Sequence, residues 1–180
     1  MSRVEASSLP SSSAFAALLS VPHLPPALPG NGYVIEDRAA GRLQCYSSKP
    51  PRENGSRPPS RGEPVPGSQT LPLLLVHSVN AAASAFEVRP LFEHYSTKRP
   101  TYSFDLPGFG LSERSKRPYT PQLMTSAVDA VVTSIQEREG DQPIDVLGLS
   151  LGCELVARAI TKRPKAFRSV ALVSPTGMSG

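Results

Sequence analysis

The sequence predicts an α/β fold in which a mostly parallel sheet follows a short N-terminal antiparallel hairpin. From residue 71 onward, short apolar runs alternate with longer segments of helical periodicity, an order that is typical of parallel sheets with right-handed crossovers. The runs are continuously apolar, as expected of strands that are buried on both faces. A length of 180 residues, 39% of them hydrophobic, suits one domain with a core of its own.

The chain begins with residues 1–30, a tail rich in serine and proline that we expect to lie outside the domain. Strand-forming residues at 33–35 and 43–46 flank a turn and predict the hairpin. Residues 47–70 are dense in Pro, Ser, Gly and Arg, so we predict a solvated, disordered and dispensable low-complexity insertion. A proline-rich docking site is the alternative interpretation of that stretch. The domain would then span residues 31–180.

Four apolar runs predict the strands that follow the insertion, at residues 73–76, 101–104, 144–148 and 170–173. Three segments with helical patterns lie between them, at residues 84–95, 121–139 and 151–162. Pro90 predicts that the first helix is kinked or built from two short pieces. In the second, Thr120 provides the N-cap, Pro121 takes the first position and Gly140 marks the end. Its apolar residues share one helical face, namely Met124, Ala127, Val128, Val131 and Ile135.

The motif Gly-x-Ser-x-Gly occupies Gly148 to Gly152, with Ser150 at its centre. The pattern is short, but it directly follows a buried strand and directly opens an amphipathic helix, which is the context this motif requires. An abrupt turn from strand to helix strains the central residue, and the glycines leave room for close backbone approach. The hydroxyl of Ser150 is therefore expected to lie exposed at the carboxyl edge of the sheet, beside a helix N-terminus.

Three motifs, in this order, resemble the α/β-hydrolase superfamily. Residues 74–80 (Leu-Leu-Val-His-Ser-Val-Asn) resemble its first parallel strand and the His-Gly turn that follows. Residues 105–112 (Asp-Leu-Pro-Gly-Phe-Gly-Leu-Ser) resemble the Asp-x-Pro-Gly-x-Gly-x-Ser loop of its epoxide-hydrolase, haloperoxidase and C–C-hydrolase branches. The Gly-x-Ser-x-Gly turn is the third motif. The resemblance covers residues 32–180 and implies the α/β-hydrolase fold, with Ser150 as nucleophile.

The resemblance also implies an oxyanion hole made of two backbone N–H groups. One belongs to Leu151, directly after the nucleophile, and the other to Val79, in the loop after the first parallel strand. Such donors are effective because they are in place before charge develops. Ser78 departs from the family pattern, which has glycine there, so a turn that needs a positive φ would form less easily.

Three further residues each have a functional and a structural interpretation. His77 could be the catalytic base, but the resemblance implies that it shapes the oxyanion loop. Asp105 could be the triad acid, but in this loop it is expected to orient the turn. Cys153 is expected to be a small packing residue, because no basic side chain lies beside it in the sequence.

A catalytic triad in this fold runs in the chain order Ser, then Asp or Glu, then His. No histidine follows Ser150, and the acidic residue that does, Glu154, comes too early. We therefore expect a fold truncated after its sixth strand, with 170–173 as an exposed edge and with the acid and base supplied by further sequence. The full-length form would be a serine hydrolase acting by acyl transfer on an ester or related carbonyl. The alternative is a non-catalytic binding or regulatory fragment that retains the hydrolase scaffold.

Composition excludes other classes. The net charge is +4, but the basic residues are scattered, so no nucleic-acid partner is expected. No apolar run reaches the roughly 18 residues that a membrane helix needs, so no membrane partner is expected. Cys45 and Cys153 lack the spacing of a zinc site, and free thiols favour a cytoplasmic location. The expected partner is a small-molecule substrate, and no metal or cofactor is implied.

Overall fold

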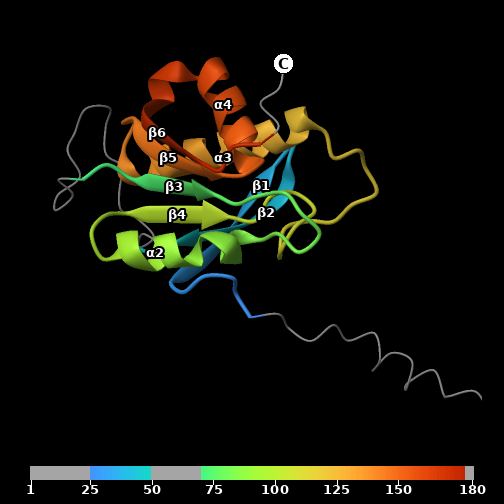
Figure 1. Cartoon of the computed structure of the whole chain (residues 1–180), viewed down its shortest axis with the longest axis horizontal. Coiled ribbons are helices and arrows are strands. Elements are labelled where there is room, and N and C mark those ends of the chain that lie inside the picture. The colour runs from blue at the N-terminus through green and yellow to red at the C-terminus, as the bar shows by residue number, and fades with distance from the viewer. Residues whose placement is uncertain (1–24, 50–69, 177–180) are drawn as a thin grey trace, which may run out of the picture.

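A computed structural model describes residues 25–49 and 70–176 as one sheet flanked by helices on both faces (Figure 1). The sheet has six strands in the order β1-β2-β4-β3-β5-β6. The β1–β2 and β2–β4 pairs are antiparallel, and the other three are parallel. The strands are β1 (Asn31–Asp37), β2 (Gly41–Ser47), β3 (Leu73–Val76), β4 (Thr101–Phe104), β5 (Ile144–Leu149) and β6 (Phe167–Val173). The predicted α/β class, parallel sheet and N-terminal hairpin are confirmed.

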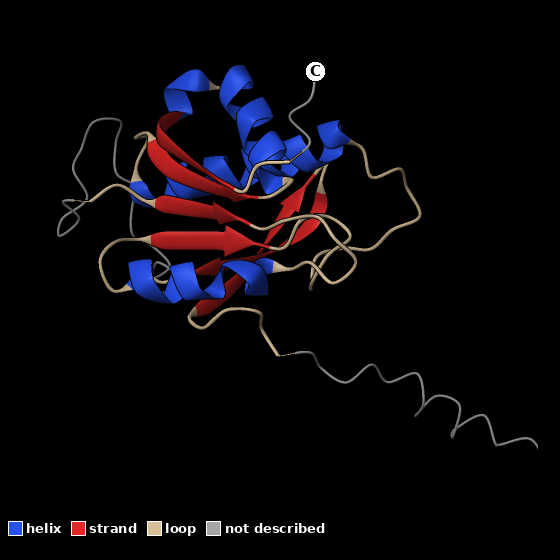
Figure 2. Ribbon diagram, in the orientation of Figure 1, coloured by secondary structure: helices blue, strands red, loops and turns tan. Residues whose placement is uncertain are grey.

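The helices lie in two layers (Figure 2). They are η1 (Ala85–Val88), α2 (Arg89–Ser96), α3 (Pro121–Glu139), α4 (Gly152–Lys162) and η2 (Pro164–Ala166). The η1–α2 pair covers one face, and α3 and α4 cover the other. The break at Pro90 confirms the predicted division of the first helix, because a 3-10 turn precedes the α-helix that carries this proline in its first turn.

The central strand β3 explains why its sequence is continuously apolar. Leu74 and Val76 belong to the cluster that contains the buried faces of α3 and α4. Leu73 and Leu75 point the other way, into the cluster that contains Phe92 of α2. Successive side chains alternate between the two faces of a strand, and here both faces are covered, so every position is apolar.

The boundaries of α3 follow its capping residues. The Thr120 side chain accepts a hydrogen bond from the Leu123 N–H at 3.2 Å, and Pro121 occupies the first turn. The helix ends at Gly140, whose φ of 98° is accessible to glycine at little cost. All five residues of the predicted apolar face are buried.

The fold reaches into both segments that the sequence placed outside it. Leu28, in the predicted tail, is buried in the cluster beneath α2. Strand β2 runs through Ser47, the residue at which the sequence places the start of the insertion, and the Ser48 N–H donates to the Thr101 carbonyl at 3.0 Å. Most of the predicted tail (1–24) and insertion (50–69) lies outside the described residues.

Candidate active site

Ser150 lies at the turn between β5 and α4, at the carboxyl edge of the parallel strands. Its φ is 53°, a left-handed conformation that costs a non-glycine residue about 1–3 kcal/mol. Two hydrogen bonds hold this geometry: the Ser150 N–H donates to the Val173 carbonyl at 2.9 Å, and the Ser150 carbonyl accepts from the Cys153 N–H at 3.0 Å. The predicted strained turn between strand and helix is confirmed.

The two glycines of the motif are needed for space. A Cβ on Gly152 would lie 2.5 Å from the carbonyl oxygen of His77, and one on Gly148 would lie 2.9 Å from the Cα of Cys153. Such distances are too short for real Cβ atoms. The absence of side chains therefore lets the turn press against the loop that follows β3.

The side chain of Ser150 has one polar neighbour in the described part of the chain. Its Oγ lies 3.2 Å from the Oγ1 of Thr176, which follows β6. Leu151 is the N-cap of α4 and makes no side-chain capping bond, and the Cys153 and Glu154 N–H groups of the first helical turn donate to the Ser150 and Leu151 carbonyls. Val79 lies in the loop that follows β3, and β3 pairs in parallel with β5, so this loop and Ser150 are at the same edge of the sheet.

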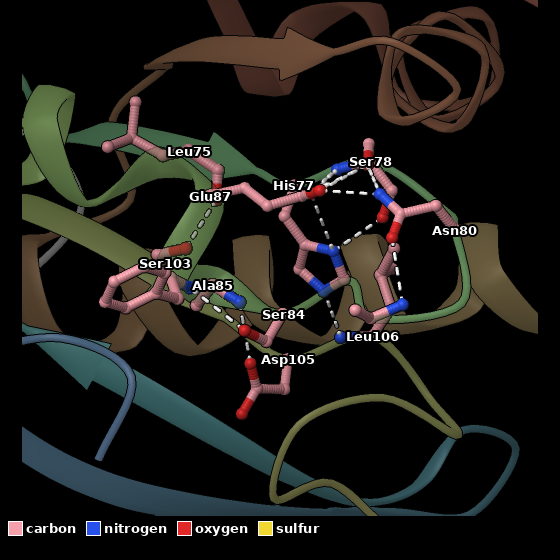
Figure 3. Close-up of polar contacts among 12 residues, drawn as sticks. Leu75, His77, Ser78, Asn80, Ser84, Ala85, Glu87, Ser103, Asp105 and Leu106 are labelled. Atoms are coloured by element: carbon pink, nitrogen blue, oxygen red, sulfur yellow. Dashed lines mark hydrogen bonds and ion pairs between the residues drawn. The ribbon is translucent and has the colours of Figure 1, made fainter. Parts of the chain in front are cut away.

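His77 is fully buried, and both of its ring nitrogens are hydrogen-bonded to backbone groups (Figure 3). The Leu106 N–H donates to its Nε2 at 2.9 Å, so the ring proton lies on Nδ1, which donates to the Ser78 carbonyl at 2.6 Å. Burial lowers the pKa of the imidazole, which keeps it neutral. With both nitrogens occupied, His77 shapes the loop, as the resemblance implied, and is not placed to act as base.

Asp105 connects three segments of the fold. One carboxylate oxygen accepts the Ala85 N–H at 2.8 Å, and the other accepts the Tyr46 hydroxyl and the Leu111 N–H, both at 2.9 Å. The side chain is fully buried. These contacts match the expected orienting role, and none of them is with Ser150.

The loop after β3 is bound by a residue that sequence reasoning missed, Glu87. Ser78 does not adopt a positive φ; instead, its N–H and hydroxyl both bond to the carboxylate of Glu87, which follows nine residues later in η1 (Figure 3). Helical periodicity places Glu87 on an ordinary solvated helix surface. The signal that could have revealed it is the serine itself, because a hydroxyl in place of glycine requires a partner.

A cavity of about 390 Å³ opens beside Val79. Its lining is apolar except for one cation and consists of Val79, Gly108, Phe109, Arg114, Tyr119 and Met124. A larger cavity of about 580 Å³ lies between residues 141–143 and 163–166, at the amino ends of β5 and β6. Ligands of open α/β sheets bind at the carboxyl ends of the strands, so the cavity beside Val79 is the one suited to a substrate.

Two other titratable residues that follow or precede the motif in the chain are engaged elsewhere. Glu154 pairs with Arg158 on the surface of α4, and His94 on α2 lies 2.8 Å from the Lys98 amine. Burial raises the pKa of the Cys153 thiol, as expected of a packing residue. Across residues 25–49 and 70–176, no group of three or more His, Cys, Asp or Glu side chains gathers as metal ligands. Over the same ranges, no helix combines the length and apolarity needed to cross a membrane.

Curated relatives match the part of the chain that contains these motifs. The (lyso)-N-acylphosphatidylethanolamine lipase of Bos taurus is 35% identical over 109 residues, which cover 59% of this chain and 30% of that protein. The 1-acylglycerol-3-phosphate O-acyltransferase of Rattus norvegicus is 34% identical over 113 residues, covering 61% of this chain and 31% of that protein. The chain thus spans about a third of the length of these relatives.

Solved structures share the fold at low sequence identity. The meta-cleavage product hydrolase from Pseudomonas fluorescens IP01 superimposes with a TM-score of 0.62 at 15% identity, covering 83% of this chain and 47% of that one. The haloalkane dehalogenase from Agrobacterium tumefaciens C58 gives a TM-score of 0.60 at 17% identity, covering 82% and 42%. The model of the alpha/beta hydrolase fold family matches residues 72–179. The chain belongs to the α/β-hydrolase fold family.

Proposed function

We propose that this chain carries the nucleophile and oxyanion hole of a serine hydrolase that acts by acyl transfer. The observation that supports this most is Ser150, held at a φ of 53° between β5 and α4. A serine with a positive φ at a helix N-terminus exposes its hydroxyl for attack on the acyl carbon. The neighbouring N–H groups can then stabilise the oxyanion that develops. The backbone N–H groups of Leu151 and Val79 are the proposed oxyanion donors.

In the proposed reaction the Oγ of Ser150 bonds to the acyl carbon while its proton passes to a base. The carbonyl electron pair moves onto oxygen, where the two N–H groups stabilise it. Collapse of this intermediate expels the alcohol, which takes the proton, and water then releases the acid by the same steps. No histidine follows Ser150 in the sequence, so we assign the base and its acid partner to sequence outside these 180 residues.

The substrate we propose is an acyl ester with an apolar chain. Val79, Phe109 and Met124 give the cavity of about 390 Å³ an apolar wall, and Arg114 adds a cation. An amphiphile with an anionic or polar head suits this combination. The lipase and acyltransferase relatives act on molecules of that kind, to judge by their names. Cys45 and Cys153 are free, buried thiols, which supports a cytoplasmic location.

A non-catalytic binding scaffold is the second candidate. It is favoured by the surroundings of Ser150, whose Oγ meets the hydroxyl of Thr176 and, within the described residues, no imidazole or carboxylate. Longer sequence from the same gene separates the two candidates. A downstream Asp and His would favour the enzyme, whereas a natural stop codon would favour the scaffold.

A serine-directed phosphonate tests the nucleophile in a form of the protein as long as its relatives. We expect covalent labelling of the wild type and none of Ser150→Ala. Ser174→Ala is the matched control, because Ser174 also has a positive φ, of 48°, and follows the neighbouring strand; it should label like the wild type. Equal labelling of Ser150→Ala and wild type would contradict the proposal.

A further inference from the structure

We propose that Glu87 is a positioning residue for the oxyanion loop, defined as residues 78–80, and thereby directs the Val79 N–H toward the substrate. The inference rests on the proposed function, since it assigns a task to the loop beside Ser150. Glu87 touches neither the nucleophile nor the space for substrate. Its role is carried by the loop residues it binds (Figure 3).

The Glu87 carboxylate accepts hydrogen bonds from three donors of the loop. One oxygen accepts the Ser78 N–H at 2.9 Å and the Ser78 hydroxyl at 2.7 Å, and the other accepts the Asn80 side-chain amide at 2.6 Å. The Asn80 amide also donates to the Ser78 hydroxyl at 2.8 Å. Hydrogen bonds to an ionised acceptor are about twice as strong as neutral ones, so one side chain fixes both ends of the loop.

The orientation of the Val79 N–H follows from the planarity of the peptide bond. The Ser78 carbonyl and the Val79 N–H belong to one peptide unit and point in opposite directions. His77 fixes the carbonyl with a bond of 2.6 Å from its Nδ1. Glu87 fixes the preceding N–H and the side chain of the same serine. Every polar group of Ser78 is therefore held, which leaves the Val79 N–H directed away from the His77 ring.

The element that carries Glu87 is itself fixed to the core. Ala85 and Val88, on either side of it in η1, are fully buried. The Ala85 N–H donates to the buried carboxylate of Asp105 at 2.8 Å, and the Glu87 N–H donates to the Ser84 carbonyl at 3.1 Å. These contacts hold η1 against the core, so the Glu87 carboxylate is a fixed reference point for the loop. Partial burial alone would raise the pKa of this carboxyl, but the bonds from Ser78 and Asn80 hold it below its usual value.

These contacts account for the departure at Ser78 from the family's glycine. A glycine would offer the carboxylate its N–H alone, whereas serine adds a hydroxyl that both donates to Glu87 and accepts from Asn80. In this chain a pair of side chains therefore supplies the loop geometry without a positive φ. Ser78 and Glu87 therefore act together to hold the loop.

The test compares Glu87→Gln with Glu93→Gln in a form of the protein with Ser150-dependent turnover of a p-nitrophenyl ester. All three groups that Glu87 binds are donors, so a glutamine amide in the same place turns its own donor toward at least one of them. Removal of a whole oxyanion donor costs about 10²–10³ in kcat. We expect a displaced donor to lower kcat about 10-fold or more, with KM changed less than about 3-fold. Glu93→Gln, which loses a surface pair with Arg89, should leave both unchanged.

Hydrogen exchange of the Ser78 amide in the same form of the protein provides a readout that needs no activity. We expect faster exchange in Glu87→Gln and no change in Glu93→Gln. If Glu87→Gln fails to fold, Ser78→Ala replaces it. Because Ser78→Ala keeps the hydrogen bond from the backbone N–H of residue 78 to Glu87, its kcat should fall by less than that expected for Glu87→Gln.

The outcomes separate the two levels of the proposal. Wild-type kcat or wild-type exchange in Glu87→Gln, together with an inactive Ser150→Ala, would overturn the role of Glu87 and leave the serine hydrolase standing. A rise in KM at constant kcat would overturn it as well, because that result assigns Glu87 to ground-state binding. Wild-type turnover by Ser150→Ala would overturn the proposed function itself.

Discussion

At the scale of single residues, the backbone conformation at position 150 and the proposed chemistry favour different amino acids. Its φ of 53° suits glycine, while the proposed reaction needs a hydroxyl. A left-handed conformation costs an L-residue roughly 1–2 kcal/mol. Natural sequences retain such strain where function depends on it.

Replacing Ser150 by glycine or by alanine should therefore change the free energy of unfolding in the reverse of the order seen at ordinary positions. We expect Ser150→Gly to be more stable than Ser150→Ala by about 1 kcal/mol, because glycine relieves the strain and loses only part of that gain to chain entropy. Urea unfolding measures the difference. At Ser169, which lies in β6 without a positive φ, the same two substitutions should fall in the opposite order. Lower stability of Ser150→Gly than of Ser150→Ala would show that the turn is not strained.

At the scale of elements, Asp145 ties strands together at the amino edge of the sheet. Its carboxylate accepts from Arg99 at 2.5 Å, from the Arg168 Nε at 2.8 Å and from the Ser169 hydroxyl at 2.6 Å. Arg99 also donates to the Leu71 carbonyl at 2.8 Å. One buried carboxylate in β5 thus connects β6 with the segments that lead into β3 and β4.

This network should make the stability of the fold sensitive to acid. Burial alone would raise the pKa of Asp145, but hydrogen bonds from Arg168, Ser169 and Arg99 lower it from 3.8 to about 2. A lowered pKa means that the stabilisation is complete above pH 3.8 and is lost as pH falls toward 2. The shift corresponds to about 2 kcal/mol. We expect Asp145→Asn to be less stable than wild type at pH 7 and the gap to narrow by that amount near pH 2.

Denaturant unfolding across this pH range provides the measurement. Glu137→Gln, on the exposed side of α3, is the control for removing a carboxylate. A gap between Asp145→Asn and wild type that stays constant from pH 7 to pH 2 would contradict the assignment.

The elements that the sequence predicts well are those whose signals are local. Thr120, Pro121 and Gly140 mark the ends of α3, and Ser150 is identified by the strand before it and the helix after it. Glu87 and Asp145 were missed because their partners lie on other elements, brought close only by the fold. Periodicity records which face a side chain occupies, not which distant donor it meets there.

At the scale of the whole molecule, β6 is the edge of the sheet, as the sequence predicted. Val170, Leu172 and Val173 are 39–42% exposed, and Arg168, the charged residue of the strand, is bound to Asp145. Unpaired backbone groups on an apolar edge are a template for association. Within the described residues, the polar contact of the Ser150 hydroxyl is with Thr176 and not with an imidazole or carboxylate.

We accordingly expect the 180-residue chain to be poorly soluble and to lack meaningful esterase activity. A positioned base contributes about 10²–10⁴-fold, and triad members act together, so the loss exceeds that range. Gel filtration and a p-nitrophenyl ester assay against Ser150→Ala measure both properties. Leu172→Lys places a charge on the apolar edge strand and should raise the soluble fraction. Thr161→Lys, at an exposed position of α4, adds the same charge away from that edge and should not. A soluble monomer with Ser150-dependent turnover like that of ordinary esterases would contradict this expectation.

The segments on either side of residues 50–69 are held at one place on the fold. The Lys49 amine pairs with Glu139 at 2.8 Å, and the Leu73 N–H reaches the Pro100 carbonyl at 2.9 Å, next to the Thr101 carbonyl that binds Ser48. Both sets of contacts lie at the amino end of β4, at the edge of the sheet opposite Ser150. Replacing residues 50–69 by a fluorescent or affinity domain would therefore place that domain on the far side of the fold from Ser150.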